Sequence, residues 1–303
     1  MNRMGYACIN THLSNSKPKV TTNRTMIKRT FTDKGLPYAS ELSLQNCKDL
    51  LTILKWNNDN GFNFFRMSSD LLPWASEYDI STLPHYDEIK DTLRQCGDYA
   101  KQHDIRITSH PGPFNVLTSP RPHVVDNCIT DLSIHGQVFD MMGLSRTPYN
   151  KINIHIGGAY GDKVSAMKRF CENFHRLPDS VKSRLTVEND DKASMYSVVD
   201  LYEGVYKVIG IPIVFDYHHH RFCDGGLSEE DALEVAISTW IDIVPVVHYS
   251  ESRSVEQEDD KIRPQAHSDY VLDYIDTYDN RVDIMVEAKA KELAVLRYKE
   301  LHS

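Results

Sequence analysis

Short apolar runs alternate with longer amphipathic stretches along the whole chain. Runs of mostly apolar residues that end at a polar residue are typical of strands buried on both faces. The stretches between them carry apolar residues at helical spacing, as at Leu44, Leu50 and Leu54. The pattern predicts strands at 4–9, 62–66, 105–108, 152–155, 185–188, 213–215, 243–247 and 282–286, and helices at 42–58, 85–103, 124–142, 163–177, 195–209, 228–240 and 289–300.

The regular alternation of strand and helix indicates the fold class. Eight strand-then-helix units fill the 303 residues, and buried strands separated by helices form parallel sheets. Eight is the number of units in a (β/α)8 barrel, so we expect one TIM-barrel domain over residues 1–303. A doubly wound open sheet is the alternative, but no GxGxxG motif follows the first strand. Residues 14–39 are polar and rich in Lys, Arg and Thr, and we expect a long loop there.

Histidines and carboxylates follow most of the predicted strands. The sixth strand ends at Asp216 and is followed by three consecutive histidines. In a barrel the carboxyl ends of all strands meet on one face, where catalytic groups lie. Each such residue alone is more often structural, but together they predict a multinuclear metal site, and Zn, Mn and Fe suit these ligand types. The polar residues at the strand ends are Asn10, His110, His155, Glu188, Asp216, His219, His248 and Glu287.

Two carboxylates in this set, Glu188 and Glu287, follow different strands, so each can bridge two metal ions. Neighbouring ions suit the hydrolysis of phosphate esters, because one lowers the pKa of the attacking water and others neutralise the phosphate. The same ligands would also suit the isomerisation of a sugar or oxygen chemistry on iron. The ligand types alone leave these reactions open.

Composition and charge narrow the class of protein. The chain is 41% hydrophobic and 25% charged, and no apolar stretch approaches the roughly 20 residues of a membrane span. The net charge of −9 argues against a general nucleic-acid coat. Six scattered cysteines without a CxxC pair indicate free thiols in a reducing compartment, so we expect a cytoplasmic protein. A local basic patch is predicted in the first long loop, at Lys17, Lys19, Arg24, Lys28 and Arg29.

An ordered series of motifs runs through nearly the whole chain. A single motif such as His-Pro-Gly is a weak signal, whereas the ordered set at these spacings is specific. On these motifs the chain resembles the UV-damage endonucleases, relatives of the endonuclease IV-type apurinic-site enzymes. The matching stretches are Gly5-Tyr6 with Asn10, Asn23-Arg24-Thr25, Arg66-Met67-Ser68-Ser69-Asp70, Pro73-Trp74-Ala75-Ser76, Ser109-His110-Pro111-Gly112, His155 with Gly157-Gly158, Tyr160-Gly161-Asp162-Lys163, Glu188-Asn189-Asp190, Asp216-Tyr217-His218-His219, His248 with Ser250, His267-Ser268-Asp269-Tyr270 and Asp283-Ile284-Met285-Val286-Glu287-Ala288-Lys289.

The resemblance implies a TIM barrel that binds two or three divalent ions, typically Mn²⁺, with Zn²⁺, Mg²⁺ or Fe²⁺ as alternatives. It implies a DNA-repair endonuclease that nicks damaged double-stranded DNA just 5′ of a UV photoproduct, either a cyclobutane dimer or a 6-4 product. The expected ends are a 3′-hydroxyl and a 5′-phosphate. We also expect a monomer that binds DNA and no membrane.

The resemblance also assigns residues to roles. Glu188, Glu287 and His248 are expected to act in catalysis through the metals, and Lys163 or Lys289 to steady the phosphate. The implied metal ligands are Glu77, His110, His155, Glu188, Asp216, His219, His248, His267 and Glu287, of which His267 rests on the resemblance alone. The residues expected at the DNA or the lesion are Tyr6, Asn10, Arg24, Trp74, Pro113 and Phe114.

Three positions depart from the family pattern. Glu77 stands where the family has a histidine, and it favours harder metals. Pro113 and Phe114 replace a Gln-Tyr pair that is expected to probe the bases opposite the lesion; proline offers no side-chain hydrogen bond, but phenylalanine can still stack on a base. Val246 replaces a lysine near the metals that is carboxylated in some members. Metal chemistry is therefore expected to be retained while recognition of the substrate differs.

Three alternatives stay open. The first is a nuclease for apurinic sites or another lesion, suggested by Pro113. The second is a sugar isomerase or iron oxygenase on the same barrel. The third is a protein that binds damaged DNA without cutting it, which the intact set of ligands disfavours.

Overall fold

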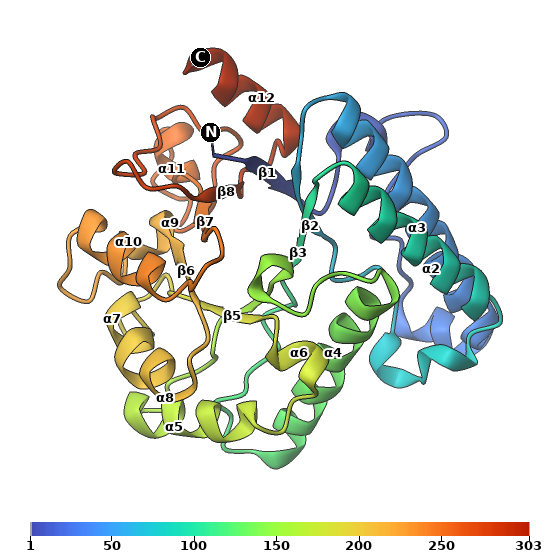
Figure 1. Cartoon of the computed structure of the whole chain (residues 1–303), viewed down its shortest axis with the longest axis horizontal. Helices are drawn as coiled ribbons and strands as arrows, with labels where there is room; N and C mark the ends of the chain where they lie inside the picture. Colours follow the sequence, from blue (N-terminus) through green and yellow to red (C-terminus); the bar gives the residue numbers. More distant parts are fainter. Residues whose placement is uncertain (1, 303) are drawn as a thin grey trace.

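Eight parallel strands close into a barrel in the computed structural model, which describes residues 2–302 (Figure 1). Each strand pairs with the next one along the chain, and the last pairs with the first. This arrangement confirms the predicted (β/α)8 barrel. The strands are β1 (Met4–Ala7), β2 (Phe64–Met67), β3 (Arg106–Ser109), β4 (Ile152–Ile154), β5 (Leu185–Glu188), β6 (Ile213–Asp216), β7 (Val246–Tyr249) and β8 (Asp283–Val286).

Helices surround the barrel on its outside (Figure 1). The longer ones are α2 (Lys28–Asp59), α3 (Tyr86–Gln102), α4 (Pro122–Met141), α5 (Lys163–Phe174), α10 (Glu229–Ser238) and α12 (Glu292–Leu301). Shorter ones are α1 (Thr11–Ser14), α6 (Asp179–Lys182), α7 (Val198–Leu201), α8 (Lys207–Ile209), α9 (Tyr217–His220) and α11 (Arg253–Glu256). Short 3-10 turns and one π turn complete the set: η1 (Ala75–Glu77), η2 (Ile80–Thr82), η3 (Pro148–Asn150) and the π turn η4 (Tyr202–Tyr206).

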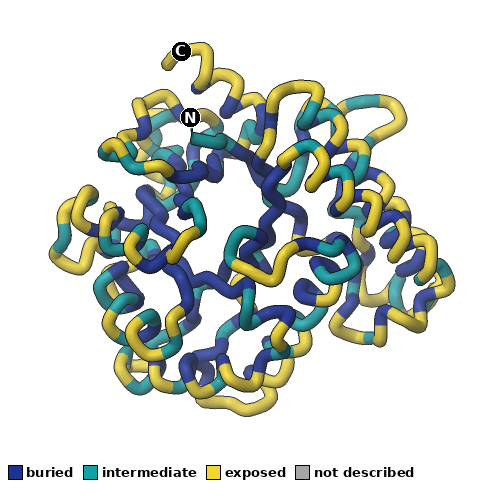
Figure 2. Tube along the Cα trace, in the orientation of Figure 1, coloured by how far each residue is buried: buried dark blue, intermediate teal, exposed yellow. Residues whose placement is uncertain are grey.

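The core has two parts. The larger one lies between the strands and the surrounding helices, and the buried residues of the barrel wall form the dark ring in Figure 2. The smaller one fills the inside of the barrel with Phe64, Val214, Val246 and Met285. A buried layer of apolar side chains thus closes the barrel from within. The polar residues at the carboxyl ends of the strands lie above this layer.

The segment predicted as a loop at 14–39 is in part helical, and this corrects the sequence analysis. Helix α2 begins at Lys28 and is kinked at Gly35, which has φ 62° and ψ −155°. Pro37 lies just after the kink, and proline disrupts the hydrogen bonding of a helix interior. The first turns of α2 face solvent, so their polar composition resembled that of a loop. The aromatic ring of Phe31 nevertheless anchors them by stacking on Trp74, with 5.5 Å between ring centroids.

Two other boundaries differ from the prediction. Strand β7 begins at Val246 instead of 243, because Pro245 has no N–H to donate to a neighbouring strand. The helix predicted at 195–209 begins at Val198, after the capping side chain of Ser197, and contains a π turn in its middle.

The cysteines and the helices agree with the expectations from composition. All six cysteines are free thiols, and only Cys8 is not fully buried. Within residues 2–302, every helix is too short or too polar to cross a bilayer.

Candidate metal centre

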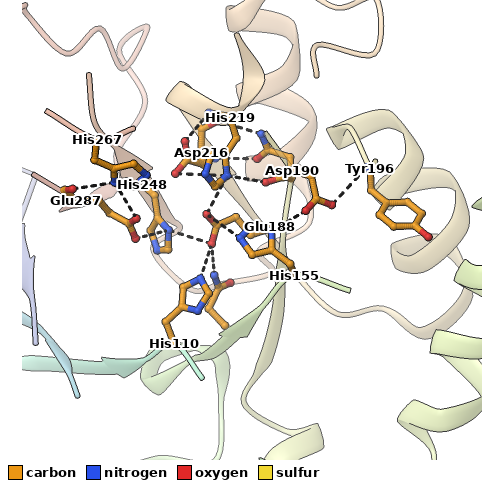
Figure 3. A network of polar contacts seen from close by, with 12 residues as sticks. His110, His155, Glu188, Asp190, Tyr196, Asp216, His219, His248, His267 and Glu287 are labelled. Carbon is orange, nitrogen blue, oxygen red and sulfur yellow. Dashed lines mark hydrogen bonds and ion pairs between the residues drawn. The ribbon is translucent and has the colours of Figure 1, made fainter. Parts of the chain in front are cut away.

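Glu188, the last residue of β5, lies at the centre of a cluster of histidines (Figure 3). Its side chain is 1% exposed. Its Oε2 atom lies 3.2 Å from His110 Nε2 and 3.1 Å from His248 Nδ1. Its Oε1 atom lies 3.4 Å from His219 Nδ1 and 3.9 Å from His155 Nε2. Each oxygen of this carboxylate therefore faces two imidazoles.

Further carboxylates extend the cluster on the side of His248. Asp216, the last residue of β6, accepts a hydrogen bond of 2.8 Å from the backbone N–H of His219. Glu287 follows β8, and its two oxygens lie 3.2 Å from His248 Nδ1 and 3.7 Å from His267 Nδ1. The barrel thus brings together all the predicted ligands except Glu77, which lies on the loop after β2.

The donor atoms of the cluster fit divalent ions. Two groups of three ligand atoms lie within 4.8 Å of one another, one from His110, His155 and Glu188 and the other from Glu188, Asp216 and His248. Asp216 Oδ2 and His248 Nδ1 are buried and lack a good hydrogen bond within the described chain, and such atoms are rare unless an unseen partner satisfies them. Imidazole and carboxylate ligands suit Mn, Fe and Zn. These residues can therefore hold two ions that share Glu188.

The charges of the cluster shift the pKa values of its members. Burial would raise the pKa of Glu188, but the histidines, His248 first, hold it well below its usual value. Burial would lower the pKa of His155, yet Glu188, Asp190 and Asp216 raise it to about 10. Asp190 Oδ1 lies 3.2 Å from His155 Nδ1. His155 would therefore have to release a proton in order to serve as a metal ligand.

Strand β4 supports the ligands from inside the barrel, which the sequence analysis missed. The side chain of Asn153 donates a hydrogen bond to Glu188 Oε2, and Lys151 Nζ lies 3.1 Å from His248 Nε2. Alternate residues of a strand face the same side, so Lys151, Asn153 and His155 all face inward. The polar–apolar alternation of this stretch was the signal that could have identified them.

Two charged residues beside the ligands were matched only as parts of motifs. Arg66 of β2 donates a hydrogen bond to Glu287 Oε1, and its own Nε is buried without a partner in the described chain. Asp190 orients His155 from the turn after β5. The sequence contains a signal for both residues. Each lies an even number of residues after a strand residue that faces into the barrel, and residues at such spacing face the same side.

The cluster opens into a cavity of about 570 Å³, which is in the range of small-molecule sites. Its walls include His110 and Glu287 from the cluster and Lys192 from the loop after β5. Gly157 forms part of the wall with φ 110°. A Cβ atom at this position would lie 2.5 Å from Thr118 Oγ1, so the close approach of the two loops requires glycine.

Three residues predicted at the metals or the phosphate lie elsewhere. Glu77 is exposed on η1, and the preceding Ser76 is hydrogen-bonded to Asp131 of α4, so its position does not support a role as ligand. Lys163 begins α5 and pairs with Asp200 at 3.0 Å. Lys289 is exposed, and neither lysine lines the cavity.

Tyr6 and Asn10, which are expected at the DNA, are fully buried. The hydroxyl of Tyr6 donates to Asn57 Oδ1 at 2.5 Å, and Asn10 Nδ2 donates to the Tyr6 oxygen at 2.8 Å. Asn10 also caps α1 by accepting from the backbone N–H of Leu13. The two residues therefore join β1 to α2 inside the protein.

Arg24 is also engaged within the protein, because its guanidinium pairs with Asp49 at 2.7 Å. The rest of the predicted basic patch is exposed: Lys17, Lys19, Lys28 and Arg29.

The predicted aromatic contacts to DNA differ in their exposure. Trp74 is half-buried and donates a hydrogen bond of 2.8 Å to the Met26 carbonyl. Phe114 is 87% exposed, and the neighbouring Pro113 lines the cavity. Phe114 therefore presents an aromatic ring to solvent next to a residue of the cavity wall.

Comparison with known proteins gives the family. The family described as UV-endonuclease UvdE matches residues 2–303. A UV-damage endonuclease of Schizosaccharomyces pombe is 37% identical over 303 residues; the match covers 97% of this chain but 49% of that protein, so the chain spans about half the length of this relative. A UV DNA damage endonuclease of Bacillus thuringiensis is 33% identical over 308 residues, covering 98% of this chain and 93% of that protein. The crystal structure of SacUVDE has a TM-score of 0.84 and 32% identity, covering 100% of this chain and 99% of that one. The chain therefore belongs to the UV-endonuclease UvdE family.

Proposed function

We propose that the protein is a metal-dependent DNA-repair endonuclease that cuts damaged double-stranded DNA on the 5′ side of UV photoproducts. One observation carries this proposal: Glu188 belongs to both groups of ligand atoms, in a chain of the UV-endonuclease family. Adjacent ions that share a carboxylate suit phosphodiester hydrolysis. We propose Mn²⁺ as the ion, with Zn²⁺, Mg²⁺ and Fe²⁺ as alternatives that the same ligand types accept.

The side chains of the cluster would hold these ions. His110 and His155 would bind one ion together with Glu188, and Asp216 and His248 would bind a second one with the same carboxylate. When bound, the ions would lower the pKa of a water molecule and neutralise charge on the phosphate. A third position would use the remaining predicted ligands, Glu287, His219 and His267.

Arg66 and Lys192 are the cations that line the cavity, and they would orient the phosphate. A guanidinium is planar and offers donors that match two oxygens of a phosphate. Hydrolysis would add water at phosphorus and break the bond to the 3′ oxygen, so the products would be a 3′-hydroxyl and a 5′-phosphate.

Phe114 would contact the damaged bases, because it is exposed beside the cavity. Stacking of an aromatic side chain on a base contributes roughly 1–3 kcal/mol, and unstacking is easiest at a damaged base. The exposed basic residues at Lys17, Lys19 and Lys28 would bind the DNA backbone against the acidic charge of the whole chain.

A nuclease for abasic sites is the second candidate, and Pro113 favours it. The side chain of a proline beside Phe114 offers no hydrogen bond to the bases opposite a lesion. Recognition would then rest on shape and stacking, which a missing base also satisfies.

A nicking assay on three labelled duplexes tests the proposal. One duplex carries a single cyclobutane dimer, the second an abasic site and the third no damage, each with Mn²⁺ and with chelator. We expect Mn²⁺-dependent cleavage of the dimer duplex and none of the undamaged duplex. Cleavage of the abasic duplex alone would favour the second candidate, and no cleavage by protein that binds Mn²⁺ would contradict both.

A further inference from the structure

Lys151 is a lysine that lies wholly inside the barrel. It immediately precedes β4, and its exposed fraction is 0%. Lysine is almost never fully buried unless it has a partner, because removing its charge from water is costly. The only side-chain partner of Nζ within residues 2–302 is His248, whose Nε2 atom lies 3.1 Å away. A role that involves His248 would therefore explain why a lysine occupies this buried position.

Lys151 is not needed to fill space inside the barrel, because apolar side chains already do so. Phe64, Val214, Val246 and Met285 fill the interior below the ligands, and a methionine at position 151 would add to this layer without burying an amine. Burial lowers the pKa of Lys151, and the neighbouring charges act in both directions: Glu188 and Glu287 raise this pKa, whereas Arg66 and Arg106 lower it.

The imidazole of His248 is contacted on both of its nitrogens. Its Nδ1 atom lies 3.1 Å from Glu188 Oε2 and 3.2 Å from Glu287 Oε1, and His248 belongs with Glu188 and Asp216 to one group of possible ligand atoms. Its Nε2 atom faces away from these carboxylates, toward Lys151. A contact at the far nitrogen fixes the rotation of the ring and therefore the direction of the near one.

We propose that Lys151 is a positioning residue for the metal centre: the hydrogen bond between its Nζ and Nε2 of His248, donated by Nε2–H when Nδ1 is free to bind, keeps Nδ1 directed at the ion that His248 would share with Glu188 and Asp216. The inference rests on the proposed function only in assuming that the centre binds a divalent ion. It assigns Lys151 no contact with the substrate. Asn153, on the same face of β4, would support Glu188 in the same way, through its side-chain hydrogen bond.

Mn²⁺ binding without DNA tests this inference. We would measure free Mn²⁺ by electron paramagnetic resonance while titrating wild-type protein, Lys151→Met and the surface control Lys101→Met. Outer partners of metal ligands typically contribute ~10–100-fold to affinity, so we expect a loss of this size for Lys151→Met and none for Lys101→Met. Unchanged Mn²⁺ affinity of folded Lys151→Met would overturn the inference. If Lys151→Met does not fold, Lys151→Leu, which also has no nitrogen to contact His248, should show the same loss, and unchanged affinity there would equally overturn it.

A double-mutant cycle distinguishes positioning from a general effect on the fold. If Lys151 acts through His248, adding Lys151→Met to His248→Gln should change Mn²⁺ affinity by less than about 2-fold, because the shared interaction is already lost. A loss as large as in the wild-type background would overturn the inference. Wild-type protein that binds Mn²⁺ but cuts no DNA would contradict the proposed function and leave this inference standing, whereas wild-type protein that binds no Mn²⁺ would contradict both.

Discussion

Glu188 Oε2 and His248 Nδ1 lie 3.1 Å apart although the two residues come from β5 and β7, with β6 between them. The register of the barrel explains this proximity. Glu188 pairs with Val214 of β6, and Asp216, two residues further along, pairs with His248. Residues an even number apart on a strand face the same side, so all three acidic and imidazole side chains point into the barrel at its carboxyl end.

Replacing the shared carboxylate should abolish metal binding. Glu188→Gln keeps the shape of the side chain but removes the charge that both groups of ligands use. We expect Mn²⁺ affinity to fall by more than ~100-fold, since even outer partners of ligands contribute up to that factor. Nicking should fall with it. Glu203→Gln, at an exposed pair with Lys207, is the matched control and should behave as wild type. Wild-type affinity of Glu188→Gln would remove this residue from the centre.

Metal affinity should rise with pH because His155 binds a proton that the ion displaces. The folded, metal-free protein raises the pKa of His155 to about 10 from its ordinary value of 6.5. Below about pH 10, Mn²⁺ binding therefore releases this proton, and affinity should increase by up to ~10-fold per pH unit. The same shift stabilises the metal-free protein fully below pH 6.5, and this stabilisation is lost as the pH rises through 10. Titration calorimetry in buffers of different ionisation enthalpy measures the released proton.

Asp190→Asn is the variant that tests the cause of this shift. Asp190 is one of the carboxylates that raise the pKa of His155, and it contacts Nδ1 at 3.2 Å. We expect the variant to release fewer protons on binding Mn²⁺ near neutral pH. Asp191→Asn, at the next residue, should leave proton release unchanged. An identical pH profile for Asp190→Asn and wild type would contradict the assignment.

The fold could be predicted from the sequence because each strand is short, apolar and closed by a polar residue. Where prediction failed, local composition was misleading. The first turns of α2 are polar because they face solvent, and they looked like a loop although Phe31 anchors them on Trp74. Pro245 shifted the start of β7 by removing a backbone donor.

The candidate site was predicted less fully than the fold. Strand-end histidines and carboxylates were identified, and the barrel brings them together. The groups that orient them, Lys151, Asn153 and Asp190, were missed because their partners lie on other strands and only the closed barrel brings them into contact. Tyr6 and Asn10 were assigned to DNA by resemblance, yet their hydrogen bonds are made inside the protein.

Removing the exposed aromatic ring should weaken recognition of damage without affecting the fold. Phe114 is 87% exposed, so Phe114→Ala should leave the melting temperature unchanged. We expect affinity for a dimer duplex to fall by roughly 5- to 150-fold, the equivalent of 1–3 kcal/mol of stacking. Binding measured by fluorescence anisotropy checks this. Val208→Ala, which removes an exposed apolar side chain of α8 outside the cavity lining, is the control. Equal affinities of Phe114→Ala and wild type would show that another group contacts the lesion.

Asp131 of α4 should control the placement of Phe114. Its two oxygens accept hydrogen bonds from Asn115 Nδ2 at 2.8 Å and from Ser76 Oγ at 3.2 Å, so it joins the loops after β3 and β2. Each bond contributes about 1 kcal/mol net, and Asp131→Ala should lower the preference for dimer over undamaged duplex by on the order of 10-fold. Asp126→Ala, at an exposed pair with Arg176 on the same helix, is the control. An unaltered preference in Asp131→Ala would mean that the loops hold their positions without this residue.

The most direct test of the account is to map the break on a duplex that carries one cyclobutane dimer, with Mn²⁺ present. Both ends of the break should be identified on a sequencing gel, with phosphatase and ligase to distinguish hydroxyl from phosphate termini. We predict one break immediately 5′ of the dimer, with a 3′-hydroxyl and a 5′-phosphate, and no break when Glu188 is replaced by Gln. A break at another position, a 3′-phosphate end, or equal cutting by the Glu188→Gln variant would contradict it.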